Sequence, residues 1–423
     1  MKWVGLLVIG LMGGVLAPLD SMAKGTDRPQ GLSAPWPISS PARAGSREAN
    51  LAALPNGGWV MSWLEPAAGA VMALRCATYR QGNWSRVATI AAGDSFFVNW
   101  ADFPSIRSLG GNRLAAHWLW RNGAGTYAYD VRVSQSSDGG ITWGRPITPH
   151  RDGKASEHGF VSLLSDSGVA WAVWLDGRAM AEHDEHSKDP MPSMTLRAAS
   201  ITADGRLVDE VELDERTCDC CQTAAVQTDR GIVVAYRDRT EDEIRDIFVT
   251  RRENGRWTAP RAVHADQWQI AGCPVNGPAL AAKGSHVAIA WYTAAADSPR
   301  VRLAFSEDSG ESFHAPIRID EGNPLGRVHV ALLEDGSALV TWLETSGRNA
   351  LIRARRVTAE GTSHPAFTVA STSAARASGF PRVLRSGNAI VFAWTESGKT
   401  PKVRVALLAG SGAQAEADKA RHE

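Results

Sequence analysis

Hydrophobic positions along the chain repeat as a unit of two short apolar segments separated by a turn. The second segment of each unit alternates apolar and polar positions and ends in an aromatic residue. Alternation with a period of two indicates β-strands rather than helices. Seven such units occur, at residues 51–63, 105–118, 161–174, 224–236, 279–291, 330–342 and 382–394.

The spacing of these units leaves room for two more strands in each. After the aromatic Trp291, for example, further apolar segments follow at 301–305 and 316–319 before the next unit begins. Repeats of four short strands are typical of propeller blades. The pattern therefore predicts an all-β fold, a seven-bladed β-propeller of four-stranded antiparallel blades, with a six-bladed ring as the alternative.

The two ends of the repeat region predict how the ring closes. The last unit stops near Leu408 after three strands, whereas the segment 33–38 has the shape of an outer strand. We expect this N-terminal strand to complete the last blade, so that the propeller occupies residues 33–408.

Two octets, 136–143 and 306–313, share the pattern S-x-D-x-G-x-[ST]-[WF] and each follows an alternating segment. In a tight turn, Asp accepts backbone hydrogen bonds and Gly adopts a positive φ, while the final aromatic packs into an apolar layer. The residues expected to build the turns are Asp138, Gly140 and Trp143 in the first octet and Asp308, Gly310 and Phe313 in the second. The octets resemble the Asp-box of the sialidase superfamily and of other bacterial-neuraminidase-repeat propellers. That resemblance implies a propeller whose octet turns lie on the face opposite its functional face.

Composition narrows the class of partner. The 423 residues include 45 basic and 45 acidic side chains, so no net field favours nucleic acid. Residues 1–23 read as a cleaved signal peptide, with Lys2, an apolar stretch and a small-residue cleavage site. We expect a periplasmic or secreted protein with no membrane span after cleavage, and a flexible tail at 410–423.

In a propeller, the blade entries and the loops after the second strands open on one face. Arg237, Arg239 and Asn276 fall there and are candidates for binding a ligand. The alternative for the two arginines is a set of salt bridges with Asp238, Asp246 and Glu243 at the rim. The ligand is expected to be a small molecule, a metal or a glycan, and a periplasmic protein is a further candidate partner. The loop 178–194 carries His183, His186, Met191 and Met194 on the same face and is either a solvated acidic loop or a copper-binding one.

The cysteines give the sharpest chemical signal at this face. Cys218, Cys220 and Cys221 precede the fourth unit and Cys273 precedes the fifth, while Cys76 stands alone. An exported protein often oxidises such neighbours, so a disulfide such as Cys221–Cys273 is one interpretation. A soft-metal site for copper or zinc is another, with the thiolates joined by His158 or His329, and a redox thiol is a third.

A catalytic role is tested by the sialidase resemblance. It implies three arginines for a substrate carboxylate, a Tyr–Glu nucleophile pair and an acid/base Asp. The usual Arg-Ile-Pro motif is absent, and the last tyrosine, Tyr292, falls in the fifth unit instead of the last. Asp102, Arg237, Tyr292 and Glu344 are the weak catalytic candidates. The sequence thus favours a non-catalytic exported propeller that binds a ligand at a cysteine-rich mouth, with an exo-sialidase-like glycoside hydrolase as the alternative.

Overall fold

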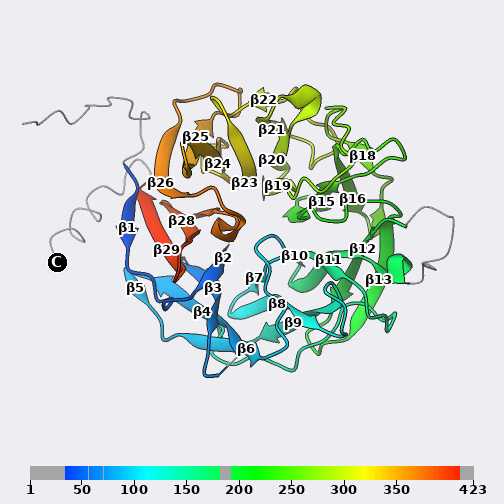
Figure 1. Ribbon diagram of the computed structural model, residues 1–423, viewed down its shortest axis with the longest axis vertical. Helices are drawn as coiled ribbons and strands as arrows, with labels where there is room; N and C mark the ends of the chain where they lie inside the picture. Colours follow the sequence, from blue (N-terminus) through cyan, green and yellow to red (C-terminus); the bar gives the residue numbers. More distant parts are fainter. Residues whose placement is uncertain (1–33, 56, 70, 182–191, 410–423) are drawn as a thin grey trace, which may run out of the picture.

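Seven antiparallel sheets surround one central axis in the computed structural model (Figure 1). The structure describes residues 34–55, 57–69, 71–181 and 192–409. The predicted seven-bladed β-propeller is confirmed, and the six-bladed alternative is wrong. The chain runs around the ring in sequence order, so each blade packs against the blades that precede and follow it.

The first three blades are built as follows. Blade 1 contains β2 (Arg47–Ala53), β3 (Trp59–Pro66), β4 (Met72–Arg80), β5 (Asn83–Trp84) and β6 (Ala88–Gly93). Blade 2 contains β7 (Ser105–Gly110), β8 (Arg113–Arg121) and β9 (Tyr129–Ser136). Blade 3 contains β10 (His158–Asp166), β11 (Val169–Asp176), β12 (Thr195–Ile201) and β13 (Leu207–Asp214), with the short helix α1 (Arg178–Ala181) after β11.

The remaining blades follow the same plan. Blade 4 contains β14 (Ala224–Thr228), β15 (Gly231–Arg237), β16 (Ile247–Glu253), β17 (Arg256–Trp257) and β18 (Arg261–Ala262). Blade 5 contains β19 (Ala279–Lys283), β20 (His286–Thr293), η1 (Ala295–Asp297), β21 (Arg300–Ser306) and β22 (Ile317–Arg318). Blade 6 contains β23 (Pro324–Leu332), β24 (Ala338–Ser346), β25 (Asn349–Val357) and β26 (Phe367–Ser373). Blade 7 contains η2 (Arg376–Ser378), β27 (Arg382–Ser386), β28 (Ala389–Glu396) and β29 (Lys402–Ala409).

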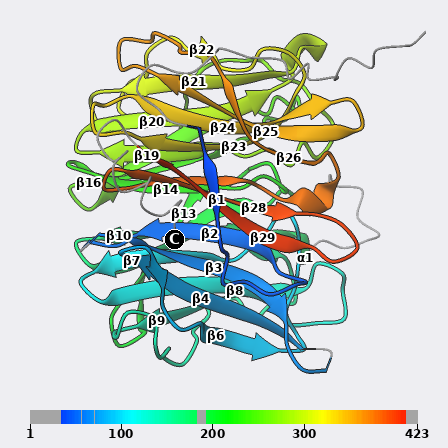
Figure 2. The same ribbon diagram turned by 90° about the vertical axis from the view of Figure 1, so that its left-hand side faces the viewer.

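The N-terminal strand β1 (Trp36–Ile38) completes blade 7, as the sequence predicts. It pairs antiparallel with β29, with Trp36 opposite Leu407 and Ile38 opposite Val405. The two ends of the propeller therefore lie side by side, visible as blue against red in Figures 1 and 2. This pairing joins the two ends of the ring non-covalently and covers the outer edge of β29.

The outer edges of the blades are less regular than a four-strand repeat suggests. In blade 2 the fourth position is reduced to a single bridge between Val133 and Ile147. In blades 1 and 4 two short strands share the third strand as their partner. A proline lies in the outer segments of blades 2 and 4, at Pro146 and Pro260. Proline has no N–H to donate, which confines it to such interrupted edges.

Tryptophans that end the second strands fill the spaces between blades. Trp63, Trp174, Trp291 and Trp342 are fully buried, each within a separate cluster of apolar side chains. The indole of Trp63 donates to Glu65, two residues further along the strand, at 2.8 Å. Trp174 and Trp342 repeat this bond with Asp176 and Glu344. The acidic residue after each of these strands thus satisfies a buried indole N–H.

The two octets form matching turns between third and fourth strands. Asp138 Oδ1 accepts from the backbone N–H of Ile141 and Thr142, at 3.1 and 2.9 Å, and Asp308 accepts from Ser312 N–H at 2.8 Å. Gly140 and Gly310 have positive φ, as expected for such turns.

The aromatic residues that end the octets are less enclosed than the pattern suggests. Trp143 and Phe313 are half-buried, each packing at the margin of a core cluster. The octet places its last side chain beside the blade edge, where the fourth strand is too short to cover it.

Three sequence expectations fall outside the described residues: the signal peptide 1–23, the tail 410–423 and the part of the histidine-containing loop at 182–191. Within the described part of the chain, none of the helices has the length and apolar character that crossing a bilayer requires.

Candidate functional site at the axial mouth

The blade entries meet around the axis through direct hydrogen bonds. Gln222 at the entry of blade 4 donates to Ala101 O before blade 2, at 2.7 Å, and accepts from Gly277 N before blade 5, at 3.0 Å. Cys218 N–H donates to Arg237 O at 2.9 Å, which ties the entry of blade 4 to the end of its second strand. The mouth is therefore a bonded surface formed by segments that are far apart in sequence.

Several first strands enter the ring through a left-handed residue. Glu48, Phe160, Val275 and Arg327 have φ between 50° and 55° at or just before the first strands of blades 1, 3, 5 and 6. Pairing registers shift at three of these points, in β2, β10 and β23. A bulge of this kind re-aims the next side chains, here toward the axis. Such conformations are unfavourable for non-glycine residues and persist where the surroundings hold them.

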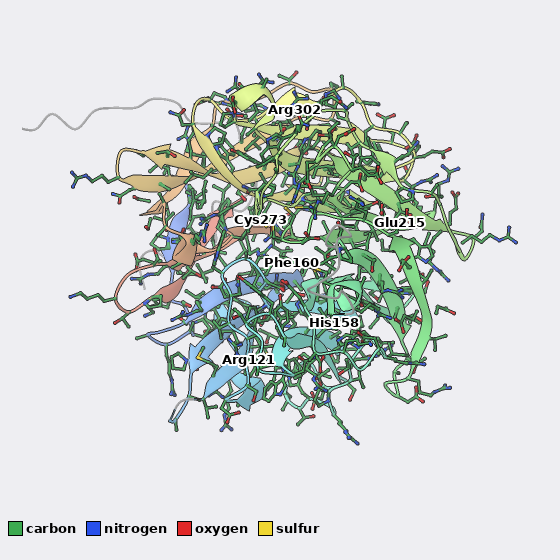
Figure 3. All side chains as sticks on the ribbon, turned by 45° about the vertical axis from the view of Figure 1, so that its right-hand side comes forward. Arg121, His158, Phe160, Glu215, Cys273 and Arg302 are labelled. Atoms are coloured by element: carbon green, nitrogen blue, oxygen red, sulfur yellow. The ribbon has the colours of Figure 1, made fainter. Side chains whose placement is uncertain are left out.

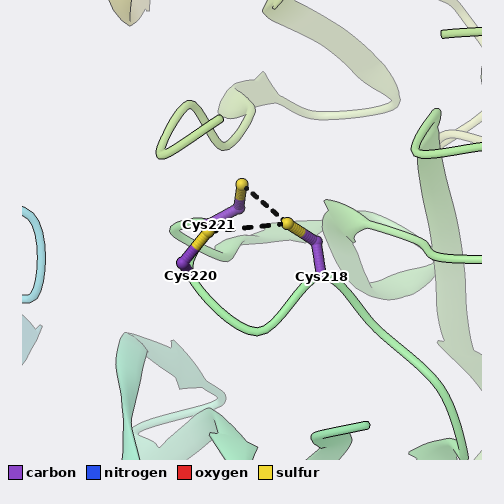
Figure 4. Close-up of side chains that lie close together, drawn as sticks. All are labelled: Cys218, Cys220 and Cys221. Carbon is purple, nitrogen blue, oxygen red and sulfur yellow. Dashed lines mark hydrogen bonds between the residues drawn. The ribbon is translucent and has the colours of Figure 1, made fainter. Parts of the chain in front are cut away.

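Cys218, Cys220 and Cys221 form a compact group in the turn that enters blade 4 (Figure 4). Their sulfur atoms all lie within 4.8 Å of one another. Cys218 Sγ is 3.8 Å from Cys220 Sγ and 3.1 Å from Cys221 Sγ. The turn at Asp219 and Cys220 lets all three sulfur atoms approach one another. We call these three residues the cysteine cluster.

Two neighbouring thiols and two arginines lower the pKa of Cys218 in the cysteine cluster. Burial alone would raise the pKa of Cys218, but hydrogen bonds from Cys220 and Cys221 and the charges of Arg237 and Arg245 hold it well below the ordinary value. Arg245 Nη1 lies 3.4 Å from Cys218 Sγ, and its side chain is only 4% exposed. The other two cysteines change in the opposite sense, because the bond with Cys218 and burial raise their pKa values.

Cys273 adjoins the cysteine cluster from blade 5. Its thiol is exposed and hydrogen-bonds with Cys220, which lowers the pKa of Cys273 to about 7. Figure 3 shows Cys273 toward the middle of the ring, with Arg302 and Glu215 toward its outside. All five cysteines are free thiols, so the proposed Cys221–Cys273 disulfide is not present in this structure. The contact of Cys273 is with Cys220 instead.

Neither histidine proposed as a metal ligand belongs to the cysteine cluster. His158 stacks on His150, with ring centroids 3.7 Å apart, and its Nε2 lies 3.0 Å from Asp152 Oδ2. His329 lines a cavity on the axis, and its Nδ1 accepts from Val383 N–H at 3.4 Å. Both residues lie near the mouth, as the sequence predicts. Their side chains, however, contact Asp152 and Val383 instead of the sulfur atoms.

The stacked histidines belong to a network that the sequence analysis missed. Asp152 bonds both rings, with its Oδ1 3.0 Å from His150 Nδ1. Asp176 lies 3.7 Å from His158 Nε2, so His and Asp ligand atoms converge here as they would for a metal. Arg178 already holds Asp176 with two bonds of 2.7 Å, which supplies the neutralising cation. This group fastens blade 2 to blade 3.

The three residues proposed to bind a ligand have their polar groups occupied. Arg237 donates to the backbone carbonyls of Asn276, Arg245 and Tyr292 and is 1% exposed. Asn276 Oδ1 accepts from Arg327 N–H at 2.7 Å. Arg239 bridges Asp219 and Glu243 at 2.9 and 2.6 Å. A substrate carboxylate would have to displace these partners, so the three residues organise the mouth.

The catalytic candidates are likewise engaged by other groups of the protein. Tyr129 OH lies 2.9 Å from Asp102 and 2.8 Å from Glu157, so it can donate to one carboxyl and accept from the other. Burial raises the pKa of these carboxyls to about 8 and about 7. Glu344 accepts from Trp342, and Tyr292 packs edge-on against the ring of Trp268. Asp102 and Tyr129 are buried, whereas Glu157, Tyr292 and Glu344 are partly exposed. No pair of exposed carboxyls flanking a substrate groove results from these positions.

Below the mouth, a cavity of about 60 Å³ runs along the axis between the first strands. Asp102, Arg107, His329 and Arg382 are its ionisable lining residues. Apolar side chains such as Phe103 and Phe380 close part of its wall. Cations thus gather at the centre of the ring as well as at the cysteine cluster.

Comparison with known proteins supports the fold. The BP39L lectin from Burkholderia pseudomallei is 11% identical, with a TM-score of 0.61, covering 88% of this chain and 97% of the lectin. The Hadza microbial sialidase Hz136 is 15% identical, with a TM-score of 0.49 over 81% of this chain and 74% of that chain. The sequence matches no protein-family model and no curated protein. The structural similarity is therefore to propellers as a fold, in agreement with the fold that the octets implied.

Proposed function

We propose that the protein is an exported β-propeller that binds a soft metal ion, copper or zinc, through the cysteine cluster at its axial mouth. The observation that supports this function is the convergence of three cysteine sulfur atoms within 4.8 Å of one another, with the pKa of Cys218 held well below its ordinary value. Thiolates are the ligands that copper(I) and zinc prefer. Cys273, with its pKa lowered to about 7, is the natural fourth donor.

One of the two sulfur–sulfur distances from Cys218 has the spacing that such an ion requires. Two sulfurs that are each about 2.3 Å from a tetrahedral metal lie about 3.8 Å apart. Cys218 and Cys220 have this separation, whereas Cys218 and Cys221 are closer, at 3.1 Å. Arg237 and Arg245 offset the negative charge that several thiolates would bring to a +1 or +2 ion.

The glycoside hydrolase alternative has less support in the same geometry. Arg237 makes four hydrogen bonds to backbone carbonyls, so it has no pair of adjacent N–H groups left to hold a sugar carboxylate. Tyr129 is buried beneath the mouth, with its hydroxyl hydrogen-bonded to acids. A fluorogenic sialoside assay on the full chain is the direct test, and we expect no turnover.

Metal analysis of purified full-length protein tests the proposed function. We expect about one copper or zinc ion per chain, lost in Cys218→Ser and retained in Cys76→Ala. Cys76 lies outside the cysteine cluster, where its thiol donates to Gly140 O, so it is the matched control. Circular dichroism would verify that both variants are folded. Native protein without stoichiometric metal, or a mass showing the loss of two hydrogens from a Cys218–Cys221 bond, would overturn the proposal in favour of a disulfide.

A further inference from the structure

Arg382 lies at the inner edge of blade 7 and lines the axial cavity. It is 8% exposed, and its Nε and Nη2 atoms are buried without a hydrogen-bond partner. These two atoms form the edge of the guanidinium that grips a carboxylate or another planar anion in a fork. A buried donor pair with no acceptor is strongly unfavourable, so this edge calls for a partner that the protein chain does not supply.

Arg107 brings a second cation to the same cavity from blade 2. Its Nε donates to Leu163 O at 2.9 Å, which neutralises none of its charge. The two guanidiniums are close enough for the charge of Arg107 to contribute, after burial, to lowering the pKa of Arg382 to about 9. Neither arginine forms a salt bridge with a carboxylate among the residues that the structure describes.

The acids near the axis do not compensate this charge at neutral pH. Burial raises the pKa of Glu48 to about 8 despite nearby arginines, and burial raises that of Asp102 to about the same value. His329 is held neutral, because burial and the two arginines lower its pKa well below the ordinary value. Asp102 is also engaged by Tyr129 OH and Phe160 N–H. The cavity therefore holds excess positive charge.

We propose that the axial cavity binds a small monovalent anion, of the size of chloride, formate or nitrate, held by Arg382 and Arg107. Its volume of about 60 Å³ sets the size limit. A single water needs about 10–15 Å³ by the same measure, so the cavity admits a few waters or one small anion and excludes a sugar. Ser105, Ser162 and Gln222 also line the wall, but their side chains already bond His117, Thr223 and the backbone of Ala101 and Gly277, so the arginines are the donors for the anion.

This site is separate from the cysteine cluster and does not depend on a bound metal. Its ligand is anionic and its residues come from blades 2 and 7, whereas the sulfur atoms come from the entries of blades 4 and 5. The anion acts as a counter-ion between the first strands of blade 2 and blade 7, which lie on either side of blade 1. Its binding therefore stabilises the closed ring. Failure of one proposal leaves the other standing.

Thermal unfolding in matched sodium salts tests the anion site. At equal ionic strength, replacing 100 mM gluconate, which is too large to enter, with chloride, nitrate or formate should raise the melting temperature by about 2–4 °C. Arg382→Met removes the charged fork at similar length and should abolish this difference. Arg206→Met, at a side chain 75% exposed, makes the same exchange on the surface and should preserve it.

Equal melting temperatures in all salts, or an anion response that survives in Arg382→Met, would overturn the proposal. If Arg382→Met does not fold, crystals of the native protein grown in bromide decide the question. An anomalous peak beside Arg382 supports the site, and a structure with bromide only elsewhere, or with water alone in the cavity, contradicts it. The halide and oxoanion arms of the salt series distinguish which kind of small anion fits best.

Discussion

The cysteine cluster and the axial cavity both bury arginine side chains, yet they balance the charge differently. Beside the cysteine cluster, hydrogen bonds from Cys220 and Cys221 and the charges of Arg237 and Arg245 lower the pKa of Cys218, and Glu243 pairs with Arg245, so acidic groups of the chain are the counter-ions. In the cavity, Arg107 and Arg382 adjoin carboxyls that burial keeps protonated near neutrality. One region is neutralised by its own sequence, and the other requires an anion from solution.

The difference follows from how the acidic groups are placed. Cys218 receives hydrogen bonds from two neighbours and from Arg245, which together outweigh burial. Glu48 feels Arg47, Arg327 and Arg382 at longer range, and burial remains the larger effect on its pKa. A buried acid thus has a lowered pKa only where hydrogen bonds and charges contact it directly, because these contacts offset the cost of desolvation and more distant charges do not.

The pH dependence of stability tests the cavity side of this comparison and has the largest expected effect. The folded pKa of Asp102, about 8, lies above its ordinary value of 3.8, so the folded state binds the proton more tightly than the unfolded state. The free energy of unfolding should fall as pH rises from about 4 to 8, by about 1.4 kcal/mol per pH unit for each such group. Glu48 and Glu157 act in the same direction.

Asp102→Asn isolates one of these protons. In urea unfolding at a series of pH values, the free energy of unfolding of this variant should fall less steeply between pH 4 and 8, by the equivalent of about one proton, and the variant should still be folded at low pH. Glu344→Gln is the matched control, since it makes the same exchange at an acid outside the cavity lining. An unchanged slope in Asp102→Asn would mean that Asp102 is ionised at neutral pH and can balance the arginines.

Removal of the Cys218 thiol tests the cysteine-cluster side of the comparison. Cys218→Ala removes one of the two acidic partners of Arg245, whose other side holds Glu243 at 2.7 Å, and should lower the free energy of unfolding by about 2 kcal/mol, measured with a chelator present. Cys76→Ala is the control, because burial raises the pKa of that thiol to about 12 and it carries no charge at neutral pH.

A double-mutant cycle separates this charge pair from packing. Arg245→Met should destabilise the native protein much more than it destabilises Cys218→Ala, because the pair is already broken in the latter. Purely additive losses would show that the thiolate and the guanidinium do not depend on each other, and the contrast between the two regions would disappear.

Much of the fold could be predicted from the sequence because propeller blades repeat a local pattern. Each second strand ends in an aromatic whose burial shows directly as periodicity, as Trp63 and Trp342 illustrate. The closure by β1 follows from counting strands. The outer edges were harder to predict, since a proline such as Pro146 reduces a strand to one bridge without changing the apolar pattern.

The candidate site could be predicted only as a set of residues sharing a face. Topology brought Cys218 and Cys273 to one mouth, but partners depend on side-chain direction, which the bulges alter. His158 was expected beside sulfur and instead stacks on His150. His150 and Asp152 carried one signal, a His-x-Asp pair just before a blade entry, which short-range pattern alone does not distinguish from a solvated turn.

The smallest expected effect concerns the octet turn at Asp308, on the face opposite the mouth. It tests whether the two binding regions act independently of that face. Asp308 accepts from Ser312 N–H at 2.8 Å and also from the hydroxyls of Ser306 and Ser312. Asp308→Ala should lower the free energy of unfolding by about 1 kcal/mol, since these donors are largely solvated when released. Glu307→Ala removes the same charge from an exposed neighbour and should change it less. Because the turn shares no residue with the cysteine cluster or the cavity lining, metal content and the anion-dependent melting shift should both match the native protein. Loss of either in Asp308→Ala, with the ring still folded, would show that the octet turns take part in ligand binding.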